Sequence, residues 1–316
     1  MGEPLLTCVC LTGPTACGKT DLALALAEQI PLEIVSMDSA MVYRGLDIGT
    51  AKPPAAVRAA APHHLIDILD PSEAYSAGRF ARDATAAIRE IAARGRLPLL
   101  VGGTLLYLRA LRDGLAALPR ADEEVRRRLD ADAAATSWAA QHERLRAVDP
   151  EAAARIAPGD RQRIQRALEV YLLTGRPLSI LQKEAEGVSA VRVDTIALVP
   201  ERREDLATRI ERRFDAMVDA GFVREVAALH ARGDLSPDMP AMRAVGYRQI
   251  WGYLDKNYDW PEARRRAIIA TRQYAKRQLT WLRGDRQCNV WTAFAPDLVA
   301  RCVRHLTDGG TSAVKS

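Results

Sequence analysis

The sequence contains no long apolar run. No stretch approaches the roughly 18 consecutive apolar residues that a membrane-spanning helix requires. The first residues lead directly into a predicted strand, without a cationic and apolar leader. We therefore expect a cytoplasmic protein that has no membrane partner.

Cysteine is scarce and forms no recognisable motif. The chain has 5 cysteines and no CxxC pair. We interpret them as reduced structural residues, because small thiols pack well in buried strands. Cys17 stands inside a glycine-rich loop, where we interpret it as a small loop residue. The cysteines are Cys8, Cys10, Cys17, Cys288 and Cys302.

Acidic residues are nearly absent between residues 264 and 286, although the formal net charge is only +5. Polyanion binding depends on such local patches more than on total charge. We therefore predict a nucleic-acid contact along this segment; the alternative is an amphipathic surface helix whose aromatic residues belong to the core. The basic residues that would share one helix face are Arg265, Arg272, Lys276 and Arg283.

A phosphate-binding motif follows the first apolar run. Residues 13–20 fit the GxxxxGK[ST] pattern and stand between a predicted strand at Leu5–Leu11 and a predicted helix at Asp21–Gln29. A bound phosphate needs both, because it lies on free N–H groups at the positive end of that helix. We therefore predict a di- or triphosphate ligand. The predicted binding residues are Gly13, Pro14, Thr15, Ala16, Cys17, Gly18, Lys19 and Thr20.

Two side chains of this loop have expected roles of their own. Lys19 would place its cation on the outer phosphates, and Thr20 would hold Mg²⁺, the predicted cofactor, through its hydroxyl. The motif does not identify the reaction, because kinases, hydrolases and transferases that release pyrophosphate share it.

The periodicity predicts an α/β fold: a P-loop-type parallel sheet flanked by helices, with an inserted all-helical subdomain. No convincing strand appears between Pro119 and Gly187. We assign residues 1–115 and 190–316 to the catalytic core and residues 116–189 to the insertion. The predicted strands are Leu5–Leu11, Leu32–Ser36, His64–Leu69, Leu97–Val101, Val193–Val199 and Asn289–Thr292, and the later predicted helices are Glu204–Ala220, Phe222–Arg232, Ala241–Leu254, Pro261–Arg283 and Pro296–Leu306.

Polar side chains follow strands that end at the same edge of the sheet as the loop. Asp38 comes just after the second strand, where it could bind Mg²⁺, take a proton or cap a turn. Thr104 follows a Gly-Gly pair after the fourth strand, where it could contact a base edge or form part of a plain turn. Arg209 and Arg213 share a helix face, which could grip a diphosphate or face solvent.

Taken together, these motifs resemble the tRNA dimethylallyltransferase (tRNA isopentenyltransferase) family. The resemblance spans residues 5–285, and the blocks Asp47–Pro53 and Thr271–Trp281 are far more specific than the phosphate-binding motif. Cys17 stands where many relatives carry Ser, a change that leaves backbone-mediated anion binding intact. Further matching blocks are Ser36–Ala40 with Tyr43, Val101–Thr104 with Tyr107, Asp160–Val170 and Gly246–Gln249.

The resemblance implies a prenyl transfer from dimethylallyl diphosphate to tRNA. The acceptor would be N6 of the adenosine 3′-adjacent to the anticodon, in tRNAs that read codons beginning with U, and pyrophosphate would be released. Asp38 would be the general base on N6, and Thr104 would hold the same adenine. Arg209 and Arg213 would stabilise the departing pyrophosphate. We expect a monomer.

The tRNA contacts of the family carry over to four parts of this sequence. One follows the second strand, one is Thr104 after the fourth strand, one lies at Arg126 near the start of the insertion, and one lies deeper in the insertion. Because Arg127 and Arg128 adjoin Arg126, the register there could differ by one residue. The carried-over residues are Asp38, Ser39, Ala40, Met41, Thr104, Arg126, Gln162, Arg163, Ile164, Gln165 and Arg166.

The residues alone leave two other functions open. A P-loop nucleoside or nucleotide kinase shares the loop and the sheet, and it would consume ATP without needing a long basic helix. An RNA-binding protein that senses a nucleotide would show nucleotide-dependent RNA affinity and no covalent product. A GTPase is disfavoured, because the sequence lacks an NKxD-type guanine-reading motif.

Overall fold

The computed structural model describes residues 5–114, 116, 118–184 and 189–309. The chain forms two compact units, one made of residues 1–112 and 190–316 and the other of residues 113–189. Residue 115, the expected end of the first core segment, lies outside the described residues.

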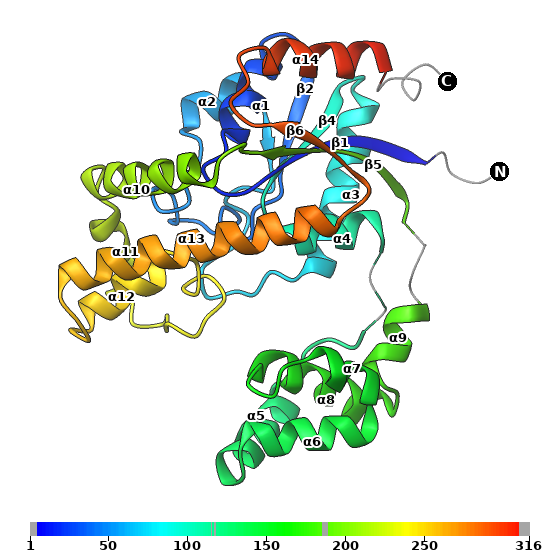
Figure 1. Ribbon diagram of the computed structural model, residues 1–316, viewed down its shortest axis with the longest axis vertical. Helices are drawn as coiled ribbons and strands as arrows, with labels where there is room; N and C mark the ends of the chain where they lie inside the picture. Colours follow the sequence, from blue (N-terminus) through cyan, green and yellow to red (C-terminus); the bar gives the residue numbers. More distant parts are fainter. Residues whose placement is uncertain (1–4, 115, 117, 185–188, 310–316) are drawn as a thin grey trace. The chain divides into compact units, whose positions relative to one another are not determined.

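The first unit is built on a sheet flanked by helices (Figure 1). The sheet has six strands in the order β3-β2-β4-β1-β5-β6, and every neighbouring pair is parallel. β1 lies between β4 and β5, with Cys10 opposite Leu100 on one side and Thr195 on the other. The predicted return of the chain to the sheet after the insertion is thus confirmed, and the carboxyl ends of the strands share one edge. The strands are β1 (Leu6–Thr12), β2 (Leu32–Ser36), β3 (His63–His64), β4 (Leu97–Gly102), β5 (Val191–Val199) and β6 (Cys288–Thr292).

Helices cover both faces of this sheet. Cys10 packs in the apolar cluster that includes α3 (Ala77–Ala93), whereas Val9 and Leu11 pack in the cluster that includes α1 (Lys19–Ala27). Successive strand residues point to opposite faces, so a strand covered on both sides is largely apolar. The other helices described in this unit are α2 (Ala55–Ala60), α4 (Leu105–Arg112), α10 (Arg203–Asp219), α11 (Phe222–His230), α12 (Tyr247–Leu254), α13 (Trp260–Gly284), α14 (Leu298–Arg304) and a π-helical turn (His305–Gly309).

In its described residues, the second unit consists of helices joined by turns and short loops. Side chains at the N-termini of four helices accept hydrogen bonds from backbone N–H groups of the first turn, which would otherwise lack a partner. Leu129, Leu145, Ile164 and Leu168 form the centre of its core. Its helices are α5 (Glu123–Ala135), α6 (Trp138–Val148), α7 (Pro150–Arg155), α8 (Arg161–Thr174) and α9 (Leu178–Glu184).

The third strand is shorter than predicted. The run His64–Leu69 indicated a strand, but β3 ends at His64. Leu65 (φ +62°) and Asp67 (φ +58°) adopt left-handed conformations, which a strand does not contain. Asp67 is held in this turn by an ion pair with the buried Lys52.

The helix predicted over Ala241–Leu254 also begins later, because α12 starts at Tyr247. Gly246 has φ +94°, and a Cβ there would lie 2.9 Å from the ring of Phe222. The Gly246 N–H donates to the side chain of Gln249 at 2.8 Å, which caps the helix. Across the described ranges, the helices fall short of the length and apolar character needed to cross a membrane.

Candidate active site

The phosphate-binding motif forms a loop between β1 and α1. Gly13 has φ +152°, and a Cβ there would lie 2.5 Å from the carbonyl oxygen of Leu198 in β5. Gly18 (φ +84°) is the N-cap of α1, so the first N–H groups of that helix open into the loop. Lys19 Nζ donates to the carbonyls of Gly13 (3.0 Å) and Pro14 (2.8 Å), which places its cation inside the loop.

The loop lines a cavity of about 580 Å³. Residues 15–20 line it from one side, and side chains from the ends of β2 and β4 and from α10 and α13 line it from the others. A second cavity of about 370 Å³ shares Thr15, Ala16, Asp38, Arg213 and Tyr274 with the first, so the two adjoin. Met41 lines the first cavity, while Ser39 and Ala40 line the second.

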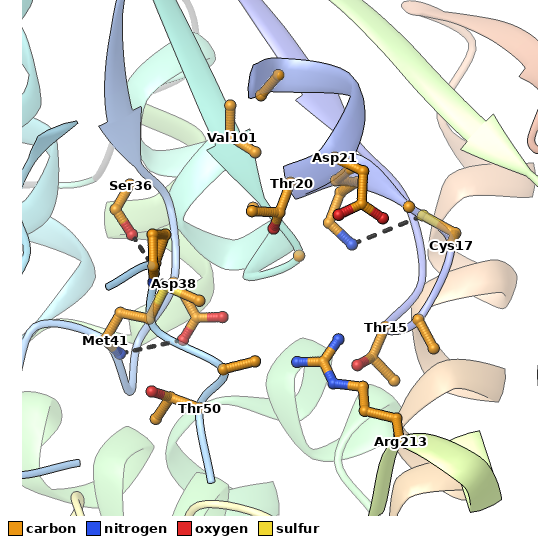
Figure 2. A pocket seen from close by; sticks show the side chains of 18 of the residues that line it. Thr15, Cys17, Thr20, Asp21, Ser36, Asp38, Met41, Thr50, Val101 and Arg213 are labelled. Carbon is orange, nitrogen blue, oxygen red and sulfur yellow. Dashed lines mark hydrogen bonds between the residues drawn. The ribbon is translucent and has the colours of Figure 1, made fainter. Parts of the chain in front are cut away.

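Asp38 has one carboxylate oxygen in a turn and one toward the cavity. Oδ1 accepts hydrogen bonds from the backbone N–H groups of Ala40 (2.8 Å) and Met41 (3.3 Å). Within the described residues, Oδ2 has no hydrogen-bond partner. Figure 2 shows Asp38 and Arg213 on opposite sides of the cavity, with Thr20 above the space between them in this view. Both interpretations of Asp38 from the sequence, turn cap and reactive carboxylate, therefore fit the geometry.

Thr104 lies beside the cavities, and it is not among the described residues that line them. Its Oγ1 accepts from the Ser39 N–H (3.1 Å) and donates to Ser39 Oγ (3.4 Å). The preceding glycines allow a close approach of other parts of the protein: a Cβ at Gly102 would overlap the Met37 backbone, and one at Gly103 would overlap the Gln278 amide. This close approach brings Thr104 next to the turn that carries Asp38.

Three arginines of α10 line the first cavity. Arg209 donates from Nε to the Ala16 carbonyl (3.1 Å) and lies over the Phe294 ring at 4.3 Å. Arg213 is half-buried and has no hydrogen-bond acceptor among the described residues. Burial lowers its pKa, although nearby Asp38 opposes that shift. A half-buried cation without an acceptor favours an anionic ligand in the cavity. Arg212 also lines the cavity, and the spacing argument from the sequence missed it.

Two residues of α13 complete the site and were also missed. Gln278 is buried; its Oε1 accepts from the Thr15 N–H (2.9 Å) and its Nε2 donates to the Gly103 carbonyl (2.8 Å). Tyr274 lines both cavities, and burial, followed by the charge of Asp38, raises its pKa to about 12. Both lie in the block Thr271–Trp281, whose resemblance to the family was the available signal.

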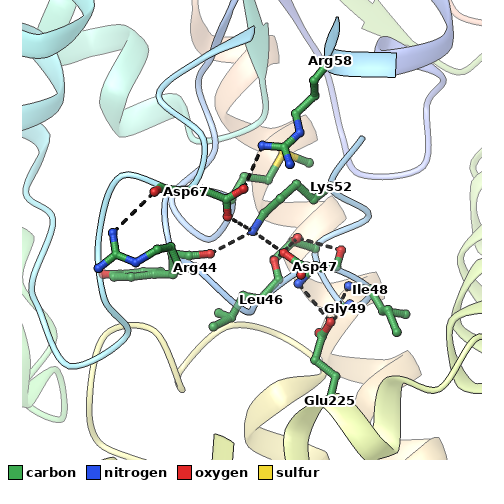
Figure 3. Close-up of polar contacts among 12 residues, drawn as sticks. Arg44, Leu46, Asp47, Ile48, Gly49, Lys52, Arg58, Asp67 and Glu225 are labelled. Atoms are coloured by element: carbon green, nitrogen blue, oxygen red, sulfur yellow. Dashed lines mark hydrogen bonds and ion pairs between the residues drawn. The ribbon is translucent and has the colours of Figure 1, made fainter. Parts of the chain in front are cut away.

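A carboxylate network fixes the loop that follows the Asp38 turn (Figure 3). Glu225 accepts hydrogen bonds from the N–H groups of Asp47 (3.0 Å), Ile48 (2.7 Å) and Gly49 (3.1 Å), and from the Tyr247 hydroxyl (2.5 Å). The next residue, Thr50, lines both cavities. The block Asp47–Pro53 therefore forms one side of the site, and a residue outside the block holds it in place.

The expected RNA contacts of the second unit differ in exposure. Gln162 and Arg163 are exposed, and Gln165 is half-buried. Ile164 is fully buried in the core of the unit, so its side chain is not exposed for a contact with RNA. Arg126 pairs with the buried Glu169, whereas its neighbour Arg127 pairs with the exposed Glu124.

The basic face of α13 is smaller than the sequence indicated. Arg265 pairs with Glu262 at 2.6 Å, and Arg272 pairs with Glu211 of α10 at 3.1 Å. Acids outside the segment thus neutralise part of the face, which the local charge count could not show. Lys276 and Arg283 are exposed, and they remain candidates for a contact with a polyanion.

Comparisons of sequence identify close relatives. A protein 61% identical over 281 residues, covering 89% of each chain, is named tRNA dimethylallyltransferase and comes from Alkalilimnicola ehrlichii. A protein of the same name from Burkholderia cenocepacia is 55% identical over 312 residues, covering 96% of each chain.

Solved structures are similar over nearly the whole chain. The full-length tRNA isopentenylpyrophosphate transferase from Bacillus halodurans is 39% identical, with a TM-score of 0.69 and 95% coverage of both chains. A eukaryotic dimethylallyltransferase acting on tRNA is 27% identical, with a TM-score of 0.75 over 95% of this chain and 77% of that one. The model of the family described as IPP transferase matches residues 41–285. The chain therefore belongs to the IPP transferase family.

Proposed function

We propose that the protein transfers a dimethylallyl group from dimethylallyl diphosphate to N6 of the adenosine 3′-adjacent to the anticodon, in tRNAs that read codons beginning with U. The names of its relatives support this proposal. The observation that carries it is one cavity in which a phosphate-binding loop and Arg213 lie with Asp38. An anion site and a carboxylate are the two groups that this transfer needs.

The leaving group would be stabilised first. As the bond between the allylic carbon and the diphosphate oxygen breaks, its electron pair leaves with pyrophosphate, and positive charge develops on the carbon. Lys19, the amides of the loop and the arginines of α10 would hold the departing charge. Such electrostatic stabilisation is usually the largest single contribution to catalysis.

Asp38 would accept the proton that N6 loses when it attacks. Its Oδ2 is directed to the cavity, while Oδ1 remains fixed by the turn. An exocyclic amine becomes acidic only as the new carbon–nitrogen bond forms, so a carboxylate is a sufficient base at that moment. Thr104, held by Ser39 at the rim, would contact the same adenine.

The residues of the cavity fit Mg²⁺ as a cofactor. The Thr20 hydroxyl and the carboxylates of Asp21 and Asp38 line it, and Mg²⁺ prefers such hard oxygen ligands. The described chain contains no cluster of three His, Cys, Asp or Glu side chains suited to a metal. Thr20 would therefore hold the ion together with diphosphate oxygens and water. When bound, Mg²⁺ would offset the charge of the diphosphate.

The tRNA would contact the Asp38–Met41 turn and the exposed polar residues of the second unit. There we propose Arg126, Gln162, Arg163, Gln165 and Arg166 as contacts, because all five are at least partly exposed. We also propose that a monomer suffices, since one chain supplies every residue of the proposed site.

One assay tests the function. The protein is incubated with dimethylallyl diphosphate, Mg²⁺ and unmodified tRNA. The RNA is then digested, and its nucleosides are analysed by mass spectrometry. We expect the mass of one dimethylallyl group on one adenosine, together with an equal amount of pyrophosphate. Release of ADP from added ATP without a modified base would contradict the proposal and favour a kinase; nucleotide-dependent RNA affinity without any product would favour a sensor.

A further inference from the structure

A buried carboxylate lies between two of the arginines proposed to contact tRNA. Glu169, in the middle of α8, has a side chain that is 0% exposed. Its Oε1 accepts from Arg126 Nε (2.8 Å) and from the Asp122 N–H at the start of α5 (2.9 Å). Its Oε2 accepts from Arg126 Nη2 (3.2 Å) and from Arg166 Nη1 (2.6 Å).

This arrangement keeps the carboxylate charged inside the unit. Burial alone would raise the pKa of Glu169, but the hydrogen bonds from Arg126, Arg166 and the Asp122 N–H, together with the charge of Arg126, lower it. A charge removed from water is tolerated only when hydrogen bonds saturate it, and here both oxygens have two partners.

The two guanidinium groups are fixed on one side and accessible on the other. The Arg126 side chain is 40% exposed and that of Arg166 is 29% exposed. Arg166 is also fixed by donation from Nη2 to the Pro119 carbonyl (2.8 Å). Each guanidinium carries five N–H donors, so donors remain after these bonds are made. Arg127, whose side chain is 74% exposed, has only a surface partner, Glu124.

We propose that Glu169 is a positioning residue for tRNA binding. It holds Arg126 and Arg166 side by side as a fixed pair of donors for the phosphates of the RNA. A fixed pair loses little side-chain entropy on binding, which two free arginines would lose. This inference rests on the proposed tRNA contacts of both arginines.

Positioning by Glu169 and simple electrostatics predict opposite changes in the affinity for RNA. Replacing Glu169 by Gln removes a negative charge next to the RNA surface, and a charge count alone therefore predicts tighter binding of a polyanion. If Glu169 positions the arginines, the same change weakens binding, because Gln offers one acceptor oxygen where two are needed. The direction of the effect thus decides between them.

The experiment varies each substrate separately in the full-length enzyme. For Glu169→Gln we expect the KM for an anticodon stem-loop RNA to rise about tenfold, as for the loss of a charged hydrogen bond. The KM for dimethylallyl diphosphate and kcat should stay within about twofold, because the donor site lies in the first unit. An unchanged or lower KM for RNA would overturn the proposal.

Asp149→Asn is the matched control. Asp149 is buried in the same unit and accepts hydrogen bonds from the Ala152 N–H and from Ser179, but from no arginine in the described residues. This variant should lower the melting temperature and leave the KM for RNA within about twofold. An equal rise in that KM would show that loss of stability, rather than lost positioning, weakens RNA binding.

Two more variants separate this inference from the function on which it rests. Arg126→Ala should weaken RNA binding. In the Arg126→Ala background, Glu169→Gln should cause a smaller further loss of RNA affinity than it causes in the parent protein. If Arg126→Ala and Arg166→Ala both bind RNA normally, the proposed contacts fail; if they weaken binding and Glu169→Gln does not, only the positioning fails. Should Glu169→Gln unfold, Glu169→Asp, which is too short to reach both arginines, carries the same expectation.

Discussion

A single carboxylate, that of Asp38, serves the fold and the proposed chemistry at once. Oδ1 accepts two N–H groups of its own turn, while Oδ2 is directed to the cavity. From the sequence, a turn cap and a general base looked like alternatives. They are compatible because a carboxylate has two oxygens, each able to take a different role.

This division of roles makes Asp38→Asn the informative variant. Asn can present its oxygen to the N–H groups of Ala40 and Met41, so the turn should survive, but it cannot take the proton from N6. We expect kcat to fall by about 10² to 10⁴ with the affinity for tRNA within a few fold. Single-turnover kinetics and RNA binding measure the two quantities.

The melting temperature of Asp38→Asn serves as the control, and we expect it to match that of the parent protein. Asp38→Ala, by contrast, removes the turn acceptor as well and should lose stability. A kcat for Asp38→Asn within a few fold of the parent would exclude Asp38 as the base.

Among the elements of the site, the loop 47–53 depends on a residue of another helix. Glu225 of α11 accepts three consecutive backbone N–H groups of this loop. Few side chains other than a carboxylate can accept so many donors at once. The loop in turn places Thr50 at both cavities.

Glu225→Gln should therefore make the loop 47–53 less firmly fixed at the site. We expect a loss of about 3 kcal/mol in the free energy of unfolding, since hydrogen bonds to charged groups contribute about 1.5–3 kcal/mol each. Because Thr50 would lose its place, kcat/KM should fall about tenfold. Urea unfolding and steady-state kinetics measure the two effects.

Glu73→Gln is the matched control for Glu225→Gln. Glu73 also accepts a loop N–H, that of Asp70 at 2.8 Å, but it is exposed and lies outside the lining of the cavities. Glu73→Gln should lower the free energy of unfolding by less than about 1 kcal/mol and leave kcat/KM unchanged. If both variants behave alike, Glu225 has no special role in the site.

The same elements show what the sequence can and cannot reveal. β1, β2 and β4 were predictable because burial on both faces leaves short, largely apolar runs. β3 was overestimated because its apolar run continues through left-handed residues, which apolarity does not report. The start of α12 depends on the contact between Gly246 and Phe222, which no local pattern contains.

The candidate site divides in the same way. Residues 13–20 were predictable because one short segment carries the whole loop, and Asp38 because it closely follows a strand. Gln278 joins that loop from 263 positions away, so only the folded chain shows its contact with Thr15. The ion pairs of Arg265 and Arg272 with acidic residues, which make the basic face of α13 smaller, likewise appear only in the folded chain.

At the scale of the whole molecule, resistance to acid depends partly on Glu33 at one side of the sheet. Glu33 of β2 is buried and accepts from Arg94 at 3.0 and 2.7 Å, and it pairs with His64 of β3 at 2.7 Å. The hydrogen bonds from Arg94, more than those from His64, lower the pKa of Glu33 to about 2. The charged carboxylate thus ties two strands to the end of α3.

A lowered pKa means that this stabilisation is present above the unfolded-state pKa and is lost as pH falls toward the folded value. We expect Glu33→Gln to be less stable than the parent by about 2 kcal/mol near pH 6, after allowance for the partly exposed Arg94. The difference in the free energy of unfolding between the two proteins should become smaller below about pH 4.5. Urea unfolding across this range measures it, and a gap independent of pH would contradict the assignment.

The order of synthesis differs from the order of the sheet. β1 is translated first and lies inside the sheet, yet its neighbour β5 follows only after the entire helical unit. Leu198 of β5 is also the residue against which Gly13 fits. A nascent chain still lacking β5 therefore carries the complete GxxxxGK[ST] motif without the strand that backs it. On the ribosome, this loop therefore gains its backing strand only after residues 191–199 have been translated.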